Sequence, residues 1–498
     1  MAPPVKQLIV VPGVVPGVVP GVVLGLVAPG LAALIGLAGC GDNLLPDPFV
    51  GLVRVSGTSP FSADCAGTAQ KGRNYAGIEV EPSIAVDPKN PLHLVGAWQQ
   101  DRWSNGGANG IGTAVSFDGG ATWRQGAPQV SQCTGGTAGN GGGYERASDP
   151  WVAIATDGTA FLSALVFDAT TDRNAIVASR SIDGGLTWSS PTVLHDDDSA
   201  DVTNDKESIT ADPVDPGRVY VVWDRLTGLT QEDQPIGTGP TWFARTSDGV
   251  WDAARPIFDP GLDAQTLGNV LVVLPDGTLV NAFDLITHAS STQSVQTLAV
   301  IRSTDKGLTW SAPILIAPMT GVGVRDPNNN LPVRSGDVLP QIAVDRASGA
   351  IYIVWEDRRP GETFDGIALV ASHDGGLSWS APALLNGAPE TSAFTPTVAV
   401  AAGGTLGVTY YDLRDANLAD GSMFRTATWL AVSDDGGQTW TDEPLGAAFD
   451  LRPAALADTY FLGDYQGLAA SAAAFVPFFV AATPDDHDHT DVFVRAAN

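Results

Sequence analysis

One octapeptide, Ser-x-Asp-x-Gly-x-Thr-Trp, recurs along this chain and constrains its fold more than any other feature. Steps of about 57 to 69 residues between copies are too long for solenoid repeats and suit the blades of a β-propeller. The repeat therefore predicts an all-β propeller. Five good copies and one eroded copy are present, at 116–123, 181–188, 303–310, 372–379, 433–440 and, eroded, 246–251.

The spacing inside the octapeptide has a physical reason. Glycine after the Asp allows the backbone to reach positive φ without a Cβ clash. The Asp carboxylate accepts backbone N–H groups across the turn, and the hydroxyl residues hold its flanks. The terminal Trp is then free to bury its ring between neighbouring blades. We therefore assign these residues a structural role.

A second repeat lies out of phase with the first and reads as two strands joined by a turn. Its copies recur about every 64 residues, and the count predicts seven blades of four antiparallel strands. Six blades, with one repeat as an insertion, is the alternative. The copies begin near Glu81, Asp149, Glu207, Gly268, Pro340, Thr395 and Asp464.

The last blade needs a strand from elsewhere in the chain. After the seventh inner repeat only residues 491–495 read as a strand, so this blade lacks its fourth strand. The segment 49–56 is strand-like and otherwise unemployed. We expect it to complete the last blade and close the ring, which removes exposed edges.

The N-terminus reads as a targeting segment. A long apolar stretch ends in Leu37-Ala-Gly-Cys40, which is similar to a bacterial lipobox with Cys40 as the lipidated residue. This predicts a signal peptide at 1–39, a lipidated tether with the closing strand at 40–74, and a propeller at 75–498. The protein would be exported and lipid-anchored at the bacterial cell envelope or surface. An uncleaved membrane anchor or a mis-assigned start site is the alternative.

Two cysteines, Cys65 and Cys133, remain after that cleavage. An even pair in an exported chain favours a disulfide, which would tie the N-terminal segment to the end of the first blade. Two unpaired buried thiols are the alternative.

The octapeptide is the Asp-box of the sialidase-like (BNR-repeat) propellers, which the chain resembles from about residue 75 to its end. Further likeness to exported bacterial members, often labelled exo-α-sialidases, lies in Glu81-Pro-Ser-Ile84, Tyr144–Trp151, Asn204–Ser208 and Gly463–Leu468. The resemblance implies that Asp-boxes lie on the face away from the ligand. It also implies that first strands begin, and second strands end, on the ligand face.

Charged and aromatic residues at those strand ends are the candidate ligand contacts. Arginine forks bind carboxylates, and acids accept sugar hydroxyls. We therefore expect a surface-anchored protein that binds glycan or another anionic ligand in a central pocket. Strand-end salt links between blades are the structural alternative. The predicted contacts are Glu81, Arg102, Glu207, Arg225, Arg358, Arg414, Asp464 and Tyr465.

An exo-acting glycoside hydrolase of the exo-α-sialidase type is the alternative function. Its nucleophile would be Tyr465 or Tyr411, activated by Glu81 or Glu207. Residues 80–83 lack the family's first arginine, and residues 105–113 lack the acid/base Asp. A non-catalytic scaffold that docks a protein is the third hypothesis.

The net charge of −29 argues against nucleic acid as a partner, because phosphate binding needs a basic surface. We expect a monomer that meets the membrane only through its lipid. No cofactor is required by these motifs, and calcium is the candidate ion. The weak metal candidates, which also read as plain polar loops, are Asp196, Asp198, His487 and His489.

Overall fold

A computed structural model describes most of the chain from residue 48 to residue 496. The residues outside the description are 1–47, 63, 66, 68, 229–236, 248, 291–292, 338, 360–362, 389, 417–422, 458, 472–473, 485–488 and 497–498. The lipobox with Cys40, His487 and the eroded octapeptide's Asp248 fall among them. Strands dominate the rest, beside two 3-10 helices, η1 (Gln132–Thr134) and η2 (Ala138–Asn140). Within the described ranges, no helix has the length and hydropathy needed to cross a bilayer.

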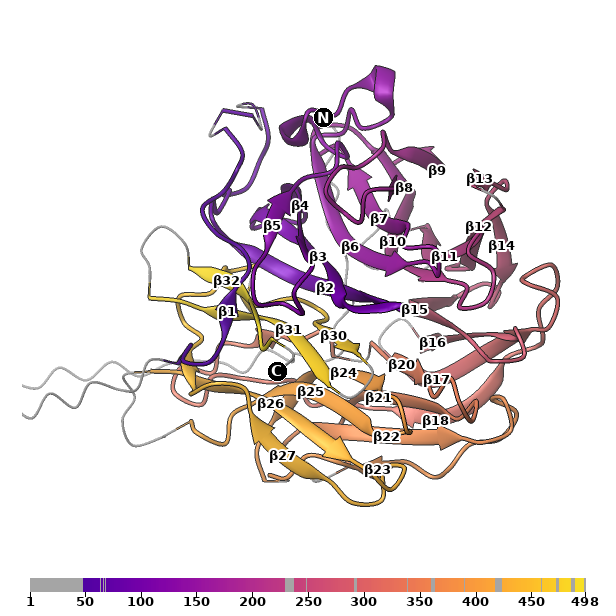
Figure 1. The fold of residues 1–498 in the computed structure, drawn as a ribbon, viewed down its shortest axis with the longest axis vertical. Helices are drawn as coiled ribbons and strands as arrows, with labels where there is room; N and C mark the ends of the chain where they lie inside the picture. The colour runs from indigo at the N-terminus through magenta and orange to yellow at the C-terminus, as the bar shows by residue number, and fades with distance from the viewer. Residues whose placement is uncertain are drawn as a thin grey trace, which may run out of the picture.

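Five antiparallel sheets of four or five strands stand as separate blades (Figure 1). In chain order they are β10 (Val202–Ala211), β11 (Arg218–Thr227), β12 (Thr241–Ser247) and β13 (Val250–Trp251), with β14 (Arg255–Phe258) on β12; β15 (Ala264–Val273), β16 (Leu279–Ser290), β17 (Gln293–Ser303) and β18 (Ile314–Met319); β20 (Gln341–Val344), β21 (Ile351–Asp357), β22 (Gly366–Ser372) and β23 (Ala383–Leu384); β24 (Ala393–Val400), β25 (Leu406–Asp412), β26 (Arg425–Ser433) and β27 (Thr441–Pro444), with β28 (Phe449–Asp450) on β26; and β30 (Gly467–Ala470), β31 (Phe475–Ala482), β32 (Thr490–Val494) and β1 (Val53–Arg54).

The first two meanders of the chain form one eight-stranded sheet instead of two blades. A single residue pair, Ala108 with Ala147, joins β4 to β6. The pairing joins the first two predicted blades into one sheet and leaves five separate blades. The prediction of seven separate blades is therefore wrong, as is the alternative of six. The strands are β2 (Glu79–Asp87), β3 (Asn90–Arg102), β4 (Ala108–Ser116), β6 (Arg146–Ile154), β7 (Ala160–Phe167), β8 (Arg173–Ser181) and β9 (Thr192–Asp198), with β5 (Arg124–Gly126) on β4.

The innermost strands lie in a closed ring around the middle of the molecule (Figure 1). Each contacts the next, and the last contacts the first, in the order β2, β6, β10, β15, β20, β24, β30. The inner repeats of the sequence are therefore all found at the centre, whichever sheets they belong to. The ring brings residues far apart in the chain side by side at the strand starts.

The ring closes through the N-terminal segment. β1 pairs antiparallel with β32, with Val53 opposite Val494 and Arg54 opposite Phe493. The indigo strand lies beside the yellow one in Figure 1. The predicted disulfide is also present, because Cys65 and Cys133 are bonded across 68 residues of sequence. Both ties join the N-terminal segment to the propeller.

The octapeptide turns have the hydrogen bonds that their spacing predicts. In the first copy Asp118 accepts the Thr122 amide at 2.8 Å and its hydroxyl at 2.6 Å, while Ser116 Oγ accepts the Gly120 amide at 2.9 Å. These bonds hold the pKa of the exposed Asp118 at about 2. The Trp123 ring packs 5.7 Å from Phe478 of the last blade. The structural role assigned to this motif is confirmed for the described copies.

Candidate functional site

A β-bulge recurs at the start of five inner strands. The pairing register shifts there, and the bulge residue has positive φ. Positive φ is strained for a side chain with a Cβ, and bulges of this kind re-aim side chains. The same bulge on successive inner strands therefore turns a set of side chains toward one another. The residues are Glu81 (φ 53°), Asp149 (52°), Lys206 (48°), Gly268 (67°) and Thr395 (50°).

Three of these bulge residues meet in a buried ionic cluster. Lys206 Nζ lies 2.6 Å from Asp464 Oδ2, 3.5 Å from Glu81 Oε1 and 3.5 Å from Asp149 Oδ2. Arg334 completes it from β19 (Val333–Arg334), with Nε donating to Asp464 Oδ1 at 2.8 Å and Nη2 donating to Oδ2. We call these five residues the central cluster. Every carboxylate in it is at most 3% exposed.

The acids of the central cluster differ in the direction in which their pKa values are shifted. Burial alone would lower the pKa of Lys206, but attraction to Asp149, Asp464 and Glu81 raises it well above its usual value. Burial opposes ionisation of Asp149, yet Lys206 and hydrogen bonds bring its pKa to about 2. Glu81 behaves differently, because burial and then Asp149 raise its pKa well above the ordinary range. The cluster thus holds one charged lysine among two ionised acids and a carboxyl group that favours its proton.

The predicted residues Glu207 and Tyr465 border a small cavity beside the central cluster. It measures about 20 Å³, so it holds at most a water molecule. The Tyr465 hydroxyl donates to the Pro150 carbonyl at 3.2 Å, and its ring lies 5.3 Å from Trp151. Both Glu207 carboxylate oxygens are buried without a hydrogen-bond partner, and burial raises the pKa of Glu207 well above its usual value. Among the described residues, this cavity beside the central cluster is too small for a sugar.

The predicted arginines do not converge. Arg102 is 1% exposed, lies 5.1 Å from the Phe461 ring and has its pKa lowered to about 10 by burial. Arg225 is held by both oxygens of Asp197 on β9, and Arg358 is exposed. Arg414 bonds Asp412 and Asp442. The link between blades that we weighed as the structural alternative therefore accounts for Arg225, whereas Arg414 bonds acids of its own blade.

The other candidates, which are Tyr411 and the possible metal ligands, do not meet in a shared site where the structure describes them. Tyr411 is 1% exposed, and its hydroxyl donates to the Val480 carbonyl at 2.8 Å, so it takes no part in the central cluster. Asp196 and Asp198 lie exposed on β9, and they do not gather with other ligand-type side chains among the described residues. His489 hydrogen-bonds the Thr483 amide through its carbonyl, and its neighbour His487 lies outside the described residues.

Lys206 and Arg334 are the residues that the sequence interpretation missed. In the bulge, the residue after Glu81, Asp149 and Thr395 is proline, whereas after Lys206 it is Glu207. Aligning Glu207 with Pro82, Pro150 and Pro396 would have placed Lys206 at the inward position. Arg334 had no such signal, since β19 lies outside the repeats and pairs with β29 (Tyr460–Phe461).

The large open site lies over β20–β23 and β24–β28. It is a cleft of about 890 Å³, a size typical of small-molecule sites. Its walls lie at the starts of β22 and β24 and after β25, which is the predicted ligand face, but they include only Arg414 of the predicted contacts. The lining combines an aromatic ring, hydroxyls and charges of both signs. Its polar and aromatic members are Arg325, Thr363, Phe364, Glu390, Thr391, Ser392 and Arg414.

Comparison with curated proteins finds two xyloglucanases. One from a Paenibacillus species is 27% identical over 345 residues, which cover 65% of this chain and 29% of that protein. One from Acetivibrio thermocellus is 26% identical over 241 residues, 45% of this chain and 26% of that protein. The chain therefore spans less than a third of the length of the curated relatives that it matches. No family model matches it.

Solved structures with a similar fold include glycan-active propellers. A Hadza microbial sialidase has a TM-score of 0.46 at 17% identity, covering 82% of this chain and 74% of that one. The α-L-arabinanase of Penicillium chrysogenum has a TM-score of 0.45 at 12% identity, covering 89% and 98%. A PL25 ulvan lyase has a TM-score of 0.47 at 12% identity, covering 73% and 80%. At these values the likeness concerns the fold alone, and the chain's own ring of antiparallel sheets is what defines it as an all-β propeller.

Replacing Lys206 tests the central cluster. Lys206→Met should lower the free energy of unfolding by about 3–5 kcal/mol, since buried carboxylates would lose their cation. Urea unfolding measures this, with the exposed Lys89→Met as control, expected within about 0.5 kcal/mol of the wild type. A Lys206→Met protein as stable as the control would contradict the assigned role.

The neighbouring Asp205 gives a pH signature. Burial, then Asp149, raises its pKa to about 7 against the opposing pull of Lys206. The folded protein keeps this proton up to about pH 7 while the unfolded chain loses it near pH 4, so this contribution to stability falls as pH rises between those values. Asp205→Asn should therefore gain stability over the wild type at pH 8 by about 2–3 kcal/mol more than at pH 5. Unfolding curves at both pH values check this, and an equal difference at both would refute it.

Proposed function

We propose that this protein binds a glycan in the cleft over β20–β28, as a carbohydrate-binding propeller of the glycoside-hydrolase-like kind. The observation that carries the proposal is the cleft itself, which combines sufficient volume with an aromatic ring and convergent polar groups. The xyloglucanase names of the two curated relatives favour a β-glucan as the first ligand to test. The central cluster supports this role by fixing the ring and does not contact the ligand.

The cleft offers a sugar both stacking and hydrogen bonding. Phe364 is half-buried and precedes β22, while the hydroxyls of Thr391 and Ser392 precede β24. Arg414 enters from the end of β25 with its guanidinium 3.7 Å above the Trp429 ring. Its bonds to Asp442 at 2.9 Å and to Tyr410 Oη at 3.0 Å fix its orientation, and 19% of the side chain remains exposed. A rigid, part-exposed guanidinium suits recognition of sugar hydroxyls or a sugar carboxylate.

Binding is better supported than hydrolysis. Glycosidases need a pair of carboxyl groups facing the scissile bond, and Glu390 is the single carboxylate among the described residues that line the cleft. The exo-α-sialidase alternative would require Tyr465 as nucleophile, which is 4% exposed and hydrogen-bonded to Pro150. We therefore place both hydrolase activities second to glycan binding.

Removing the aromatic ring tests the cleft. Phe364→Ala should weaken binding of xyloglucan oligosaccharides at least tenfold in calorimetric titration, because the stacking surface is lost. Phe117→Ala is the matched control, since that ring is 45% exposed in the first octapeptide turn and should leave affinity unchanged. Equal affinity in both variants would move the ligand out of this cleft.

The same samples separate binding from catalysis. Assays of xyloglucan and of a fluorogenic sialoside should show no turnover. Turnover of the sialoside that is lost in Tyr465→Phe would establish the sialidase alternative instead. If no member of a glycan panel binds the wild type, the proposed function is wrong.

We further propose that the protein is exported and lipid-anchored at the bacterial envelope through Cys40, which lies outside the described residues. Supporting this is the Leu-Ala-Gly-Cys sequence that ends the apolar N-terminal stretch. Radiolabelled palmitate should be incorporated by the wild type and by Cys65→Ser in a bacterial host, and not by Cys40→Ser. Label retained in Cys40→Ser would refute the anchor.

A further inference from the structure

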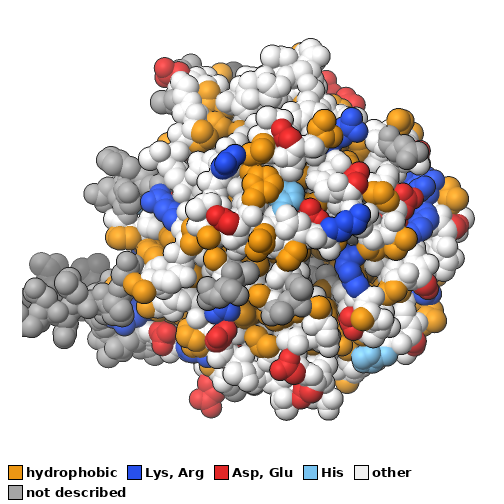
Figure 2. Space-filling model, in the orientation of Figure 1, with side chains coloured by type: hydrophobic (Ala, Val, Ile, Leu, Met, Phe, Trp, Pro, Cys, Tyr) orange, Lys and Arg blue, Asp and Glu red, His pale blue; other side chains and the backbone are white. Residues whose placement is uncertain are grey.

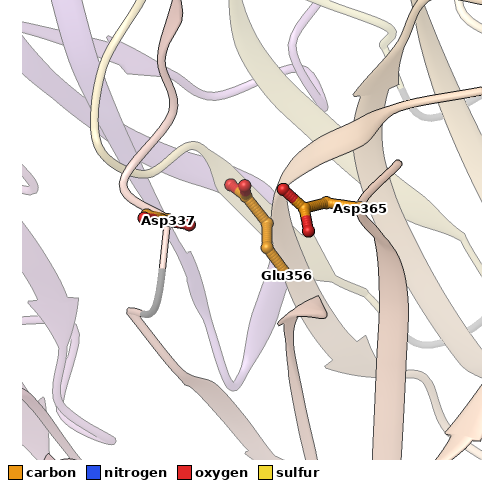
Figure 3. A group of neighbouring side chains, drawn as sticks. All are labelled: Asp337, Glu356 and Asp365. Carbon is orange, nitrogen blue, oxygen red and sulfur yellow. The ribbon is translucent and has the colours of Figure 1, made fainter. Parts of the chain in front are cut away.

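Three carboxyl groups meet under the wall of the cleft. Asp337 precedes β20, Glu356 lies in β21 and Asp365 precedes β22, so the fold brings them together from one blade (Figure 3). One oxygen from each lies within 4.8 Å of the others. In Figure 3 the carboxyl group of Glu356 lies between the other two. We call these residues the acidic triad.

Two members of the acidic triad are held firmly by neutral donors. Glu356, 1% exposed, accepts Ser335 Oγ at 2.9 Å and the Thr395 amide at 2.8 Å. Asp365, 0% exposed, accepts the amides of Val322 and Gly323 at 2.9 and 2.7 Å. These bonds aim both carboxylates without neutralising them. Val322 and Gly323 also line the cleft, so the triad supports its wall.

Asp337 has a carboxylate oxygen whose hydrogen-bonding capacity is unused. Its Oδ1 is buried and has no hydrogen-bond partner, although it lies within the triad. Asp284 on β16 is 0% exposed, its Oδ2 is also buried without a partner, and burial, followed by repulsion from Asp337, raises the pKa of Asp284. Buried polar atoms nearly always have partners, so the orphaned oxygen of Asp337 requires an explanation.

No basic side chain neutralises these acids within the described part of the chain. Neither Lys nor Arg there forms an ion pair with Asp284, Asp337, Glu356 or Asp365. Burial and then mutual repulsion raise the pKa of Asp337 to about 6 and that of Glu356 well above its usual value. The remaining charged groups that face Asp365 are Asp357 and the exposed Arg358. The site therefore needs either protons or a cation.

The space beside the acidic triad is kept open by a glycine. A Cβ on Gly321 would come within 2.5 Å of Asp337 Oδ1 and 3.7 Å of Asp365 Oδ2. A side chain at this position would collide with Asp337 Oδ1. Calcium takes oxygen ligands at about 2.3–2.6 Å in flexible geometry, so two ligands on opposite sides of it are about 5 Å apart. The triad's separations fit that span.

We propose that Asp337, Glu356 and Asp365 bind one calcium ion beneath the cleft. The ion joins the segment before β20 to β21 and to the residue before β22, and through Asp365 it steadies the backbone at Val322 and Gly323. The inference does not depend on the glycan proposal, because the test below contains no sugar.

Calorimetric titration of the metal-stripped protein with CaCl2 at pH 7.5 tests the site. We expect one ion per chain, and at least tenfold weaker binding in Asp337→Asn, which removes a charge but no hydrogen bond to Oδ1. Asp196→Asn/Asp198→Asn is the matched control and should bind like the wild type. Absence of binding, unchanged affinity in Asp337→Asn, or loss in the β9 control would each overturn the proposal.

Thermal melting gives a second readout. Should Asp337→Asn fail to fold, melting of the wild type decides, since calcium should raise Tm relative to EDTA. An unchanged Tm would overturn the site.

Discussion

The ion pair between Lys206 and three buried carboxylates is the interaction on which the ring depends. Glu81, Asp149 and Lys206 come from bulges on β2, β6 and β10, and Asp464 precedes β30, so one ammonium group links strands from both ends of the chain. A buried ion pair contributes little net stability compared with an apolar core. Its effect here is positional, because Lys206 contacts carboxyl groups that come from three other segments of the chain.

The cavity beside the central cluster is small, and the large cleft lies elsewhere on the propeller. Arg334 and Arg102 pack against Phe461, and Tyr465 caps the remaining space, which leaves about 20 Å³. The cleft of about 890 Å³ forms instead over the blades of β20 and β24, where the connecting segments stand apart. On the face shown in Figure 2, basic and acidic side chains are interspersed among apolar ones, so no single-sign field covers it. The net charge of −29 is therefore not presented as one uniform acidic field on this face.

Sequence patterns predicted the octapeptide turns, the closing strand and the disulfide, and the structure contains each of them. Glu81, Asp149 and Asp464 were found because they open inner repeats. Lys206 was missed by one position, since a bulge adds a residue and changes which side chain faces inward. The five separate blades were missed because the pairing of Ala108 with Ala147 leaves no sequence signal.

The sequence by itself determined the propeller fold, because the octapeptide turns and the inner strands are set by short stretches of sequence that repeat in phase. It also determined which strands are innermost and which motif is structural. Only the tertiary structure decided that the cavity beside the central cluster is small and that Arg225 pairs with a neighbouring blade. It alone also brought Asp337, Glu356 and Asp365 together. The physical reason is that pairing, burial and cavity shape depend on contacts between distant segments, which local propensity does not encode.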